Sequence, residues 1–292
     1  GIMSKKFSQG FLMLSYRHSF HAGNFADVLK HTVQSLIIEA LQQKPKPFVY
    51  FDTHAAAGRY NLRDDKSEKT GEYKEGIGRL WGRDDIPESM QPYIDAVESI
   101  NPNGELQYYP GSPLVAKYLI GNANRLELTE LHPTDIQLLQ QEFAGDRKVR
   151  IQKIDGYKAL NAGLPPAQRR ALVLIDPPFE LKTEHDDAIR GIKESHKRFA
   201  TGIYALWYPM VSRAQVTRFC DKMSAQGIRN ILRIELCVKE DTDGFGMTGS
   251  GMIIVNPPWK LIQQMEQLLP WLTQLLAQDN KAKFTLEWLV EE

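Results

Sequence analysis

A continuous apolar run that ends abruptly on an acid and two prolines constrains this chain most. Residues 171–175 are all apolar, a pattern typical of a strand buried on both faces of a parallel sheet. Asp176, Pro177, Pro178 and Phe179 follow directly, and proline cannot continue the hydrogen-bonded ladder. We therefore expect Asp176 to stand at the carboxyl end of a buried strand, the edge where open α/β sheets bind their ligands.

These four residues suit the recognition of an amino group on a flat ring. The Asp176 carboxylate can accept one N–H, the Pro177 carbonyl can accept another, and the Phe179 ring can stack on the ring face. The motif resembles the Asp/Asn-Pro-Pro-aromatic signature of methyltransferases that act on exocyclic or amide nitrogens. The alternative interpretation is a surface turn that simply ends a strand.

The composition is that of an ordinary globular chain of 292 residues, with 42% hydrophobic and 25% charged residues. No apolar run approaches the roughly 20 residues of a membrane span, and the first residues lack a signal-peptide pattern, so we expect a cytoplasmic protein without a membrane partner. Cys220 and Cys237 lack metal-ligand spacing, and no metal site is expected. Because the net charge is +0, local basic clusters would have to hold any nucleic acid.

Short apolar strands alternate with helical segments along most of the chain. This alternation predicts βαβ units and a parallel sheet, and therefore the α/β class. Asn24 can cap a helix that runs from about Phe25 to Gln43, where the apolar residues follow helical spacing. Strands are expected at residues 48–52, 125–129, 149–154, 171–175, 203–207, 230–238, 252–255 and 284–290.

The segment 61–109 differs from its surroundings, since it is charged, punctuated by glycine and typical of short helices without strands. It predicts a small helical subdomain inserted into an α/β domain made of residues 13–60 and 110–292. Residues 1–12 are expected to be an N-terminal extension.

Four acidic residues occupy the same kind of position, directly after a predicted strand. They are Asp52, Glu130, Asp155 and Asp176, and in a parallel sheet all four would lie along one edge. Glu130 suits the two hydroxyls of a ribose, and Asp155 suits an adenine amino group, with Gly156 leaving room for the ring. A nucleoside held in this way beside Asp-Pro-Pro-Phe indicates S-adenosylmethionine rather than a dinucleotide, and no phosphate-binding Gly-Lys-Ser/Thr loop is present.

Two other stretches imitate functional motifs. Residues 244–249 match the Gly-x-Gly-x-x-Gly dinucleotide pattern, but a strand rather than a helix follows, so we expect a hairpin loop. Residues 256–259, Asn-Pro-Pro-Trp, imitate the Asp176 motif. They follow the second strand of that hairpin, and their end of the strand is expected to face away from the cofactor edge.

Seven motifs extend the resemblance over nearly the whole chain from Met13 onward. They are Tyr16–Asn24, Asp27–His31, Asp52–His54, Tyr109–Pro113, Glu130–Pro133, Asp155–Gly156 and Asp176–Phe179. Together they resemble the bacterial 23S ribosomal RNA adenine-N6 methyltransferases of the J type. The resemblance implies a Rossmann-like class I S-adenosylmethionine-dependent methyltransferase fold, with a mostly parallel seven-stranded sheet and an inserted helical subdomain. It also implies that the target is N6 of adenine 2030 in 23S rRNA, and we expect a monomer.

The resemblance further implies roles for individual residues. Asp176 would accept the proton, with Pro177, Pro178 and Phe179 completing the catalytic motif. Tyr16 would contact the RNA, and Arg17, His18 and Lys30 could grip its backbone or stack on its bases, the alternative being solvated surface charge. The residues expected at S-adenosylmethionine, and so at the product S-adenosylhomocysteine, are His31, His54, Ser112, Glu130, Asp155, Gly156 and Asp176.

Three positions depart from the family pattern. Ala56 stands where the family tends to have glycine, Phe25 where it tends to have histidine, and Phe179 where it tends to have tyrosine. The stacking or apolar role is kept at the last two positions, and the extra methyl group of Ala56 narrows the predicted cofactor loop.

Two other hypotheses remain open at this point. The first is an enzyme of the same fold that acts on guanine N2, on DNA adenine or on a protein glutamine, although Asp rather than Asn at position 176 disfavours glutamine. The second is a catalytically silent RNA-binding assembly factor, against which the intact set of four acidic strand ends argues.

Overall fold

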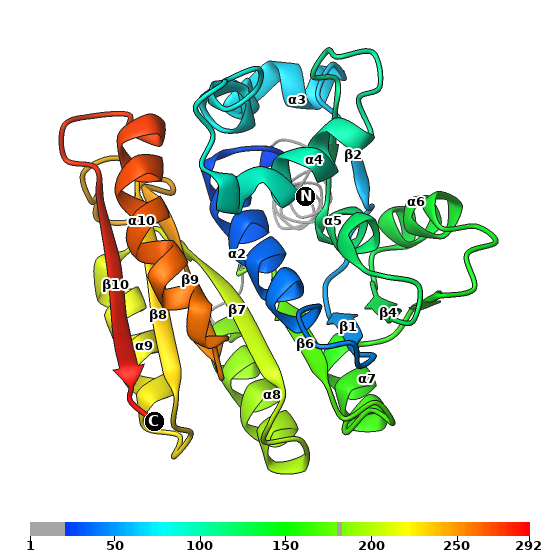
Figure 1. The fold of residues 1–292 in the computed structure, drawn as a ribbon. Coiled ribbons are helices and arrows are strands. Elements are labelled where there is room, and N and C mark those ends of the chain that lie inside the picture. Colours follow the sequence, from blue (N-terminus) through cyan, green and yellow to red (C-terminus); the bar gives the residue numbers. More distant parts are fainter. Residues whose placement is uncertain (1–20, 180–182) are drawn as a thin grey trace, which may run out of the picture.

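A computed structural model describes residues 21–179 and 183–292, and a central β-sheet dominates this part of the chain (Figure 1). Its eight strands are β1 (Val49–Asp52), β4 (Arg125–Thr129), β5 (Val149–Gln152), β6 (Ala171–Ile175), β7 (Ile203–Met210), β8 (Ile231–Cys237), β9 (Gly249–Val255) and β10 (Lys283–Val290). The strand order is β10-β8-β9-β7-β6-β1-β4-β5.

The sheet is mostly parallel, as predicted. The strands β5, β4, β1, β6 and β7 pair in parallel with their neighbours, whereas β9 runs antiparallel between β7 and β8. The resemblance implies seven strands, which is one too few, because the strand expected at 284–290 (β10) pairs antiparallel with β8 and extends the edge of the sheet.

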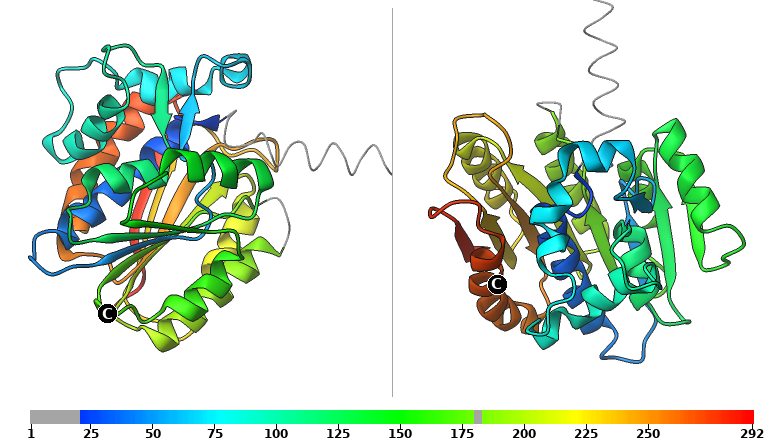
Figure 2. Two further views of the ribbon diagram at one scale, coloured as in Figure 1. Left: turned by 90° about the vertical axis from the view of Figure 1, so that its right-hand side faces the viewer. Right: turned by 90° about the horizontal axis from the view of Figure 1, so that it is seen from above.

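Helices cover both faces of the sheet (Figures 1 and 2). On one face, α2 (Phe25–Leu41) and α10 (Trp259–Leu276) share a hydrophobic cluster with the sheet, and on the other face α7 (Gly156–Gly163), α8 (Glu184–Arg198) and α9 (Arg213–Ser224) share a second one. The side chains of strand β6 point alternately to the two faces of the sheet and so contribute to both clusters. Leu172 and Leu174 belong to the α2 side, and Ala171, Val173 and Ile175 belong to the α8 side. This double burial explains why the strand is apolar at every position.

Helix α2 begins where the sequence predicts, and it ends two residues earlier than expected. The Asn24 side chain accepts a hydrogen bond from the Asp27 backbone N–H at 3.0 Å and caps the helix. The helix is buried almost all round, and its buried residues include the polar side chains of Lys30, His31 and Gln34. A helix that buries polar side chains requires partners for them elsewhere in the fold.

The predicted insert, residues 61–109, begins and ends within two short strands that pair antiparallel, β2 (Arg59–Asn61) and β3 (Tyr108–Pro110). This segment contains α3 (Asp65–Thr70), α4 (Gln91–Ser99) and three 3-10 turns. Its apolar residues join the same hydrophobic cluster as α2, and the Ile77 N–H donates to the Gly23 carbonyl at 2.8 Å. The division of the chain into two structural units stays a prediction.

The two stretches that resemble functional motifs, residues 244–249 and 256–259, lie where the sequence predicts. Residues 244–249 belong to the connection between the antiparallel strands β8 and β9, so no helix opens there. At the other end of β9, Val255 pairs with Tyr204 at the start of β7. Asn256 therefore stands at the sheet edge opposite Asp176, and its side chain donates to the carbonyls of Ala200 and Gly202.

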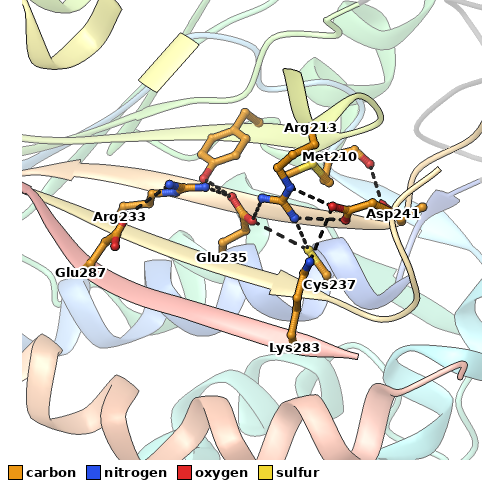
Figure 3. Close-up of polar contacts among 10 residues, drawn as sticks. Met210, Arg213, Arg233, Glu235, Cys237, Asp241, Lys283 and Glu287 are labelled. Atoms are coloured by element: carbon orange, nitrogen blue, oxygen red, sulfur yellow. Dashed lines mark hydrogen bonds and ion pairs between the residues drawn. The ribbon is translucent and has the colours of Figure 1, made fainter. Parts of the chain in front are cut away.

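A buried charge network crosses the strands at the β10 side of the sheet (Figure 3). Glu235 of β8 is 1% exposed and accepts hydrogen bonds from Arg213 of α9 at 2.6 Å, from Arg233 at 2.9 Å and from Tyr208 at 2.9 Å. Arg233 also reaches Glu287 of β10 at 3.1 Å. The network therefore holds α9 and the two outer strands on a single buried carboxylate.

Replacing Glu235 by alanine should destabilise the protein severely, because two partly buried guanidinium groups would lose their common partner. Breaking a buried ion pair in this way costs about 3–5 kcal/mol. Urea unfolding measures the effect, and Glu287→Ala is the matched control, since its half-exposed carboxylate is worth at most about 1 kcal/mol. Equal effects of the two substitutions would contradict this role of Glu235.

Candidate active site

The four acidic residues predicted at strand ends meet along one edge of the sheet. Asp52, Glu130, Asp155 and Asp176 stand at or just after the carboxyl ends of β1, β4, β5 and β6, which are neighbours in the parallel part of the sheet. A cavity of about 530 Å³ opens at this edge. The predicted cofactor residues that line it are His54, Glu130, Asp155 and Asp176.

Glu130 is fixed by backbone donors. Its Oε1 accepts a hydrogen bond from the Ala56 N–H at 2.8 Å, and its Oε2 accepts from the N–H groups of Leu131 at 2.8 Å and His132 at 2.9 Å. These bonds join the loop after β1 to the end of β4. The carboxylate is thus held in one orientation at the cavity wall, which is what recognition of a ribose diol requires.

Asp155 caps α7, because its Oδ1 accepts hydrogen bonds from the N–H groups of Tyr157 at 2.9 Å and Lys158 at 3.1 Å. Gly156 does not line this cavity. A Cβ atom there would lie 2.4 Å from the Thr53 carbonyl oxygen, so glycine is needed where α7 passes the loop after β1. The nearby His54 ring contacts the Tyr157 ring edge-on, with centroids 5.7 Å apart.

Asp52, the last residue of β1, is 1% exposed and does not line this cavity. Its Oδ2 accepts hydrogen bonds from the hydroxyls of Tyr50 and Ser112, both at 2.6 Å. Burial raises the pKa of Asp52 to about 6, although both hydroxyl donors act in the opposite direction. Ser112, predicted as a cofactor residue, is therefore a partner of Asp52 in this structure.

His31 is 1% exposed and lies beside Tyr109, whose hydroxyl is 2.6 Å from His31 Nδ1. Burial lowers the pKa of His31 to about 4, so the ring is neutral at neutral pH. Its Nε2 atom and the Oδ1 atom of Asp52 are buried and have no hydrogen-bond partner within the described residues. Neither residue lines the cavity of about 530 Å³, so the predicted contact of His31 with S-adenosylmethionine stays a prediction.

Lys30 lies at the centre of a buried ion pair rather than on the surface. Its ammonium is 2.5 Å from Asp176 Oδ2 and 3.1 Å from Asp27 Oδ1, and the Lys30 residue is 6% exposed. Burial alone would lower the pKa of Lys30, but the two carboxylates outweigh it and raise the pKa above its ordinary value. The predicted contact of Lys30 with RNA stays a prediction, whereas its contact with Asp176 is direct.

A second cavity, of about 290 Å³, adjoins the first. Asp176 and Pro178 line both cavities, and Lys30 lines the second. The remaining walls of the second cavity come from distant parts of the chain. They are His21, Asn24, Ala26, Asp27, Pro177, Trp207, Val211, Gly246 and Met247. Asp176 thus stands in the partition between a cofactor-sized cavity and a smaller one.

Some site residues were missed by the sequence interpretation, and others lie elsewhere than expected. Trp207 and Asp27 were missed, although β7 neighbours β6 and Asp27 lies one turn before Lys30. Phe179 lines neither cavity, and its ring packs on His185 and Trp207 with centroid distances of 4.9 and 6.1 Å. Tyr16, Arg17 and His18 lie outside the described residues.

The strand order, with a reversed β9 inserted between β7 and β8, and the acidic carboxyl edge define a class I methyltransferase fold. Comparison with known proteins narrows this class. The family model described as ribosomal RNA large subunit methyltransferase D, RlmJ matches residues 45–290. The chain belongs to this RlmJ family.

Two individual relatives are similar to this chain over their full length. The chain is 57% identical over 280 residues to ribosomal RNA large subunit methyltransferase J of Escherichia coli, covering 96% of this chain and all of the relative. It is 52% identical over 281 residues to the protein of the same name from Haemophilus influenzae, with the same coverage. The solved structure of protein LPL1258 from Legionella pneumophila is 38% identical, with a TM-score of 0.85 over 92% of this chain and 98% of that chain.

Two negative findings complete the description. In residues 21–179 and 183–292, no cluster of three or more His, Cys, Asp or Glu side chains is arranged to hold a metal ion. In the same part of the chain, no helix is long and apolar enough to cross a membrane.

Because Asp52 is buried, we expect the free energies of unfolding of the wild type and of Asp52→Asn to depend differently on pH. The folded-state pKa of about 6 lies above the ordinary 3.8, so the favourable contribution of Asp52 is fully present below about pH 4 and is lost as the pH rises through 6. Between pH 4 and 8 the free energy of unfolding of the wild type should fall by about 2 kcal/mol relative to that of the variant. Urea unfolding across this range measures the shift, and a constant difference would contradict it.

Ala56 predicts a second stability effect. Its φ angle is +57°, a left-handed conformation that disfavours side chains and favours glycine. Ala56→Gly should therefore raise the free energy of unfolding by up to about 1 kcal/mol. Ala57→Gly is the control, because Ala57 has no positive φ and the same change should destabilise by about 0.5–1 kcal/mol. Thermal unfolding of both variants tests the contrast.

Proposed function

We propose that this chain is a cytoplasmic enzyme that transfers a methyl group from S-adenosylmethionine to N6 of an adenine in 23S rRNA. The relatives' names support large-subunit rRNA as the substrate. One structural observation carries the choice of chemistry: Asp176 lies in the partition between two adjoining cavities, one sized for the cofactor and one lined by an aromatic ring. Adenine 2030 remains the target that the family resemblance implies.

S-adenosylmethionine would occupy the cavity of about 530 Å³. Glu130 would hold the ribose hydroxyls, Asp155 would accept from the adenine amino group of the cofactor, and His54 would contact it from the loop after β1. When bound, the cofactor would supply an electrophilic methyl group carried on a sulfonium sulfur. The neutral thioether of S-adenosylhomocysteine is a good leaving group and needs no metal ion.

The target adenine would occupy the cavity of about 290 Å³, with its ring beside Trp207. A base reaches this strand end only when it is unpaired or flipped out of its helix. Asp176 Oδ2 is engaged by Lys30, while Oδ1 has no hydrogen-bond partner among residues 21–179 and 183–292. Asp176 Oδ1 and the Pro177 carbonyl would each accept one hydrogen of the amino group.

This arrangement acts on a poor nucleophile, since the amino lone pair of adenine is delocalised into the ring. Two acceptors in fixed positions orient the nitrogen in line with the methyl group and stabilise the positive charge that develops on it. The surplus proton of the methylated amino group would leave to Asp176 or to water. Lys30 holds the Asp176 carboxylate in place and remains charged throughout.

Asp176→Ala should abolish methyl transfer, with a loss of at least about 100-fold in kcat, while cofactor binding is largely kept. The fold should survive, because Lys30 retains Asp27 as a partner. Tritiated methyl transfer to 23S rRNA from cells lacking the enzyme measures activity, and calorimetry measures S-adenosylmethionine affinity. Full activity of the variant would rule out this mechanism.

Nucleoside analysis of the labelled RNA tests the position of the methyl group. Label in N6-methyladenosine is expected. Label in N2-methylguanosine would keep the fold and the site but overturn the adenine assignment. No label from the wild type, with the cofactor still bound, would overturn the proposed activity itself.

A further inference from the structure

The connection between β8 and β9 presents an aromatic side chain to solvent. Phe245 is 82% exposed and stands between Gly244 and Gly246, whose φ angles are +92° and +79°. The connection projects from the body of the molecule, in yellow to orange, in the left view of Figure 2. These residues belong to the glycine-rich stretch that imitates a dinucleotide motif, and the methyl-transfer mechanism above does not use them.

The exposed ring is adjacent in sequence to the proposed target pocket. Gly246 and Met247, the two residues that follow Phe245, line the cavity of about 290 Å³ together with Asp176 and Lys30. A nucleotide whose base enters this cavity therefore comes close to the β8–β9 connection. Its neighbours in the RNA strand would lie within reach of Phe245, which directly precedes Gly246 and is exposed.

The connection is held firmly at its base, on the side of β8 (Figure 3). Arg213 binds the carboxylate of Asp241 with two hydrogen bonds, of 3.0 and 3.1 Å, and is itself anchored on the buried Glu235 at 2.6 Å. Lys283 of β10 adds a further ion pair to Asp241 at 3.5 Å. Bidentate arginine–carboxylate pairs fix geometry as well as charge.

Hydrogen bonds also shape the tip and the far end. The Thr242 hydroxyl donates to the Phe245 carbonyl at 2.8 Å, and the Gly244 N–H donates to the Thr242 carbonyl at 2.8 Å. At the far end, the Thr248 N–H donates to the Met210 carbonyl at 2.9 Å. The backbone on either side of Phe245 is thereby restrained, which lowers the entropy cost of using its ring for binding.

The charges around Phe245 decide which part of an RNA it can contact. Glu240 and Asp243 of the same connection are exposed, and they disfavour a phosphate group nearby. An aromatic face, in contrast, stacks on any base without requiring a positive charge. The chemistry of the tip therefore fits a nucleobase rather than the sugar–phosphate backbone.

We propose that Phe245 stacks on a base that neighbours the target adenine in the RNA strand and so helps to hold the target out of its helix. This inference rests on the proposed RNA methylation and adds a residue for substrate positioning to it. The ring would cover the face of the neighbouring base that is exposed when the target leaves the stack, while Met247 and Asp176 receive the target itself.

The test compares Phe245→Ala, Phe245→Trp and Phe245→Leu on a transcript of 23S rRNA. Loss of a base–aromatic stack should lower kcat/KM for RNA by about 5- to 150-fold in the alanine variant. The tryptophan variant should retain wild-type kcat/KM, and leucine should not restore it, because the contact is aromatic. S-adenosylmethionine affinity and the melting temperature should not change in any of the three, since the ring is exposed.

Trp259→Ala is the matched control, because Trp259 is 71% exposed and follows the end of β9 at the opposite sheet edge. Its kcat/KM should equal that of the wild type. A second measurement uses a short RNA in which each nucleotide flanking the target is made abasic in turn. At one flanking position the wild type and Phe245→Ala should become equally active, because the stacking partner is gone.

The outcomes separate this inference from the function on which it rests. If the wild type methylates the transcript and Phe245→Ala does so equally well, or if leucine restores activity as fully as tryptophan, the stacking role is wrong and the function stands. An effect seen on ribosomal particles but not on naked RNA would point to a protein partner and also overturn it. If the wild type methylates no RNA, both proposals fail together.

Discussion

The ion pair between Lys30 and Asp176 is the interaction on which the site depends. It joins residues 146 positions apart in the sequence, and their side chains are 7% and 6% exposed. Two charges removed from water in this way are tolerated only when their geometry is close and further partners share the charge, as Asp27 does here. The pair therefore ties α2 to the end of β6, and Asp27 supports the same ammonium from within α2.

The same pair explains why an aromatic ring other than Phe179 faces the second cavity. The Lys30 ammonium lies 5.5 Å from the centroid of the Trp207 ring, and Trp207 is 7% exposed at the cavity wall. Phe179 adopts a positive φ of 51° and packs behind Trp207. The Asp-Pro-Pro-Phe motif thus supplies the carboxylate and the carbonyl at the cavity, and its aromatic residue supports the ring that lies there.

Local patterns in the sequence were sufficient for much of the fold. The uninterrupted apolar run of β6, the Asn24 cap of α2 and the acids after β1, β4, β5 and β6 each follow from rules that act within a few residues. The strand-end rule also correctly placed Asn256 at the opposite edge. The edge strand β10 was recognised as a strand, but its pairing with β8 depends on where the chain returns after α10, and the length of a sheet is not encoded locally.

The partners of buried polar residues could not be predicted in the same way. Lys30 follows the pattern of a surface lysine in an amphipathic helix. Nothing near it in the sequence indicates that its partner is Asp176, 146 residues later. The same holds for Ser112, whose hydroxyl meets Asp52 across 60 residues. Buried polar groups need partners wherever the fold provides them, so their identity emerges only when α2, α5 (Ser112–Leu119) and the sheet are assembled.

These contacts give the two carboxylate oxygens of Asp176 different roles. A carboxylate that was free at both oxygens could rotate and accept both hydrogens of an amino group by itself. With Oδ2 held by Lys30, one oxygen remains, and the second acceptor must come from the rigid Pro177 carbonyl. Under the proposed function, the amino nitrogen would be held by two acceptors in fixed positions, with its lone pair directed toward the cavity proposed for the cofactor. Lys30 would thus contribute to the orientation of the substrate through Asp176.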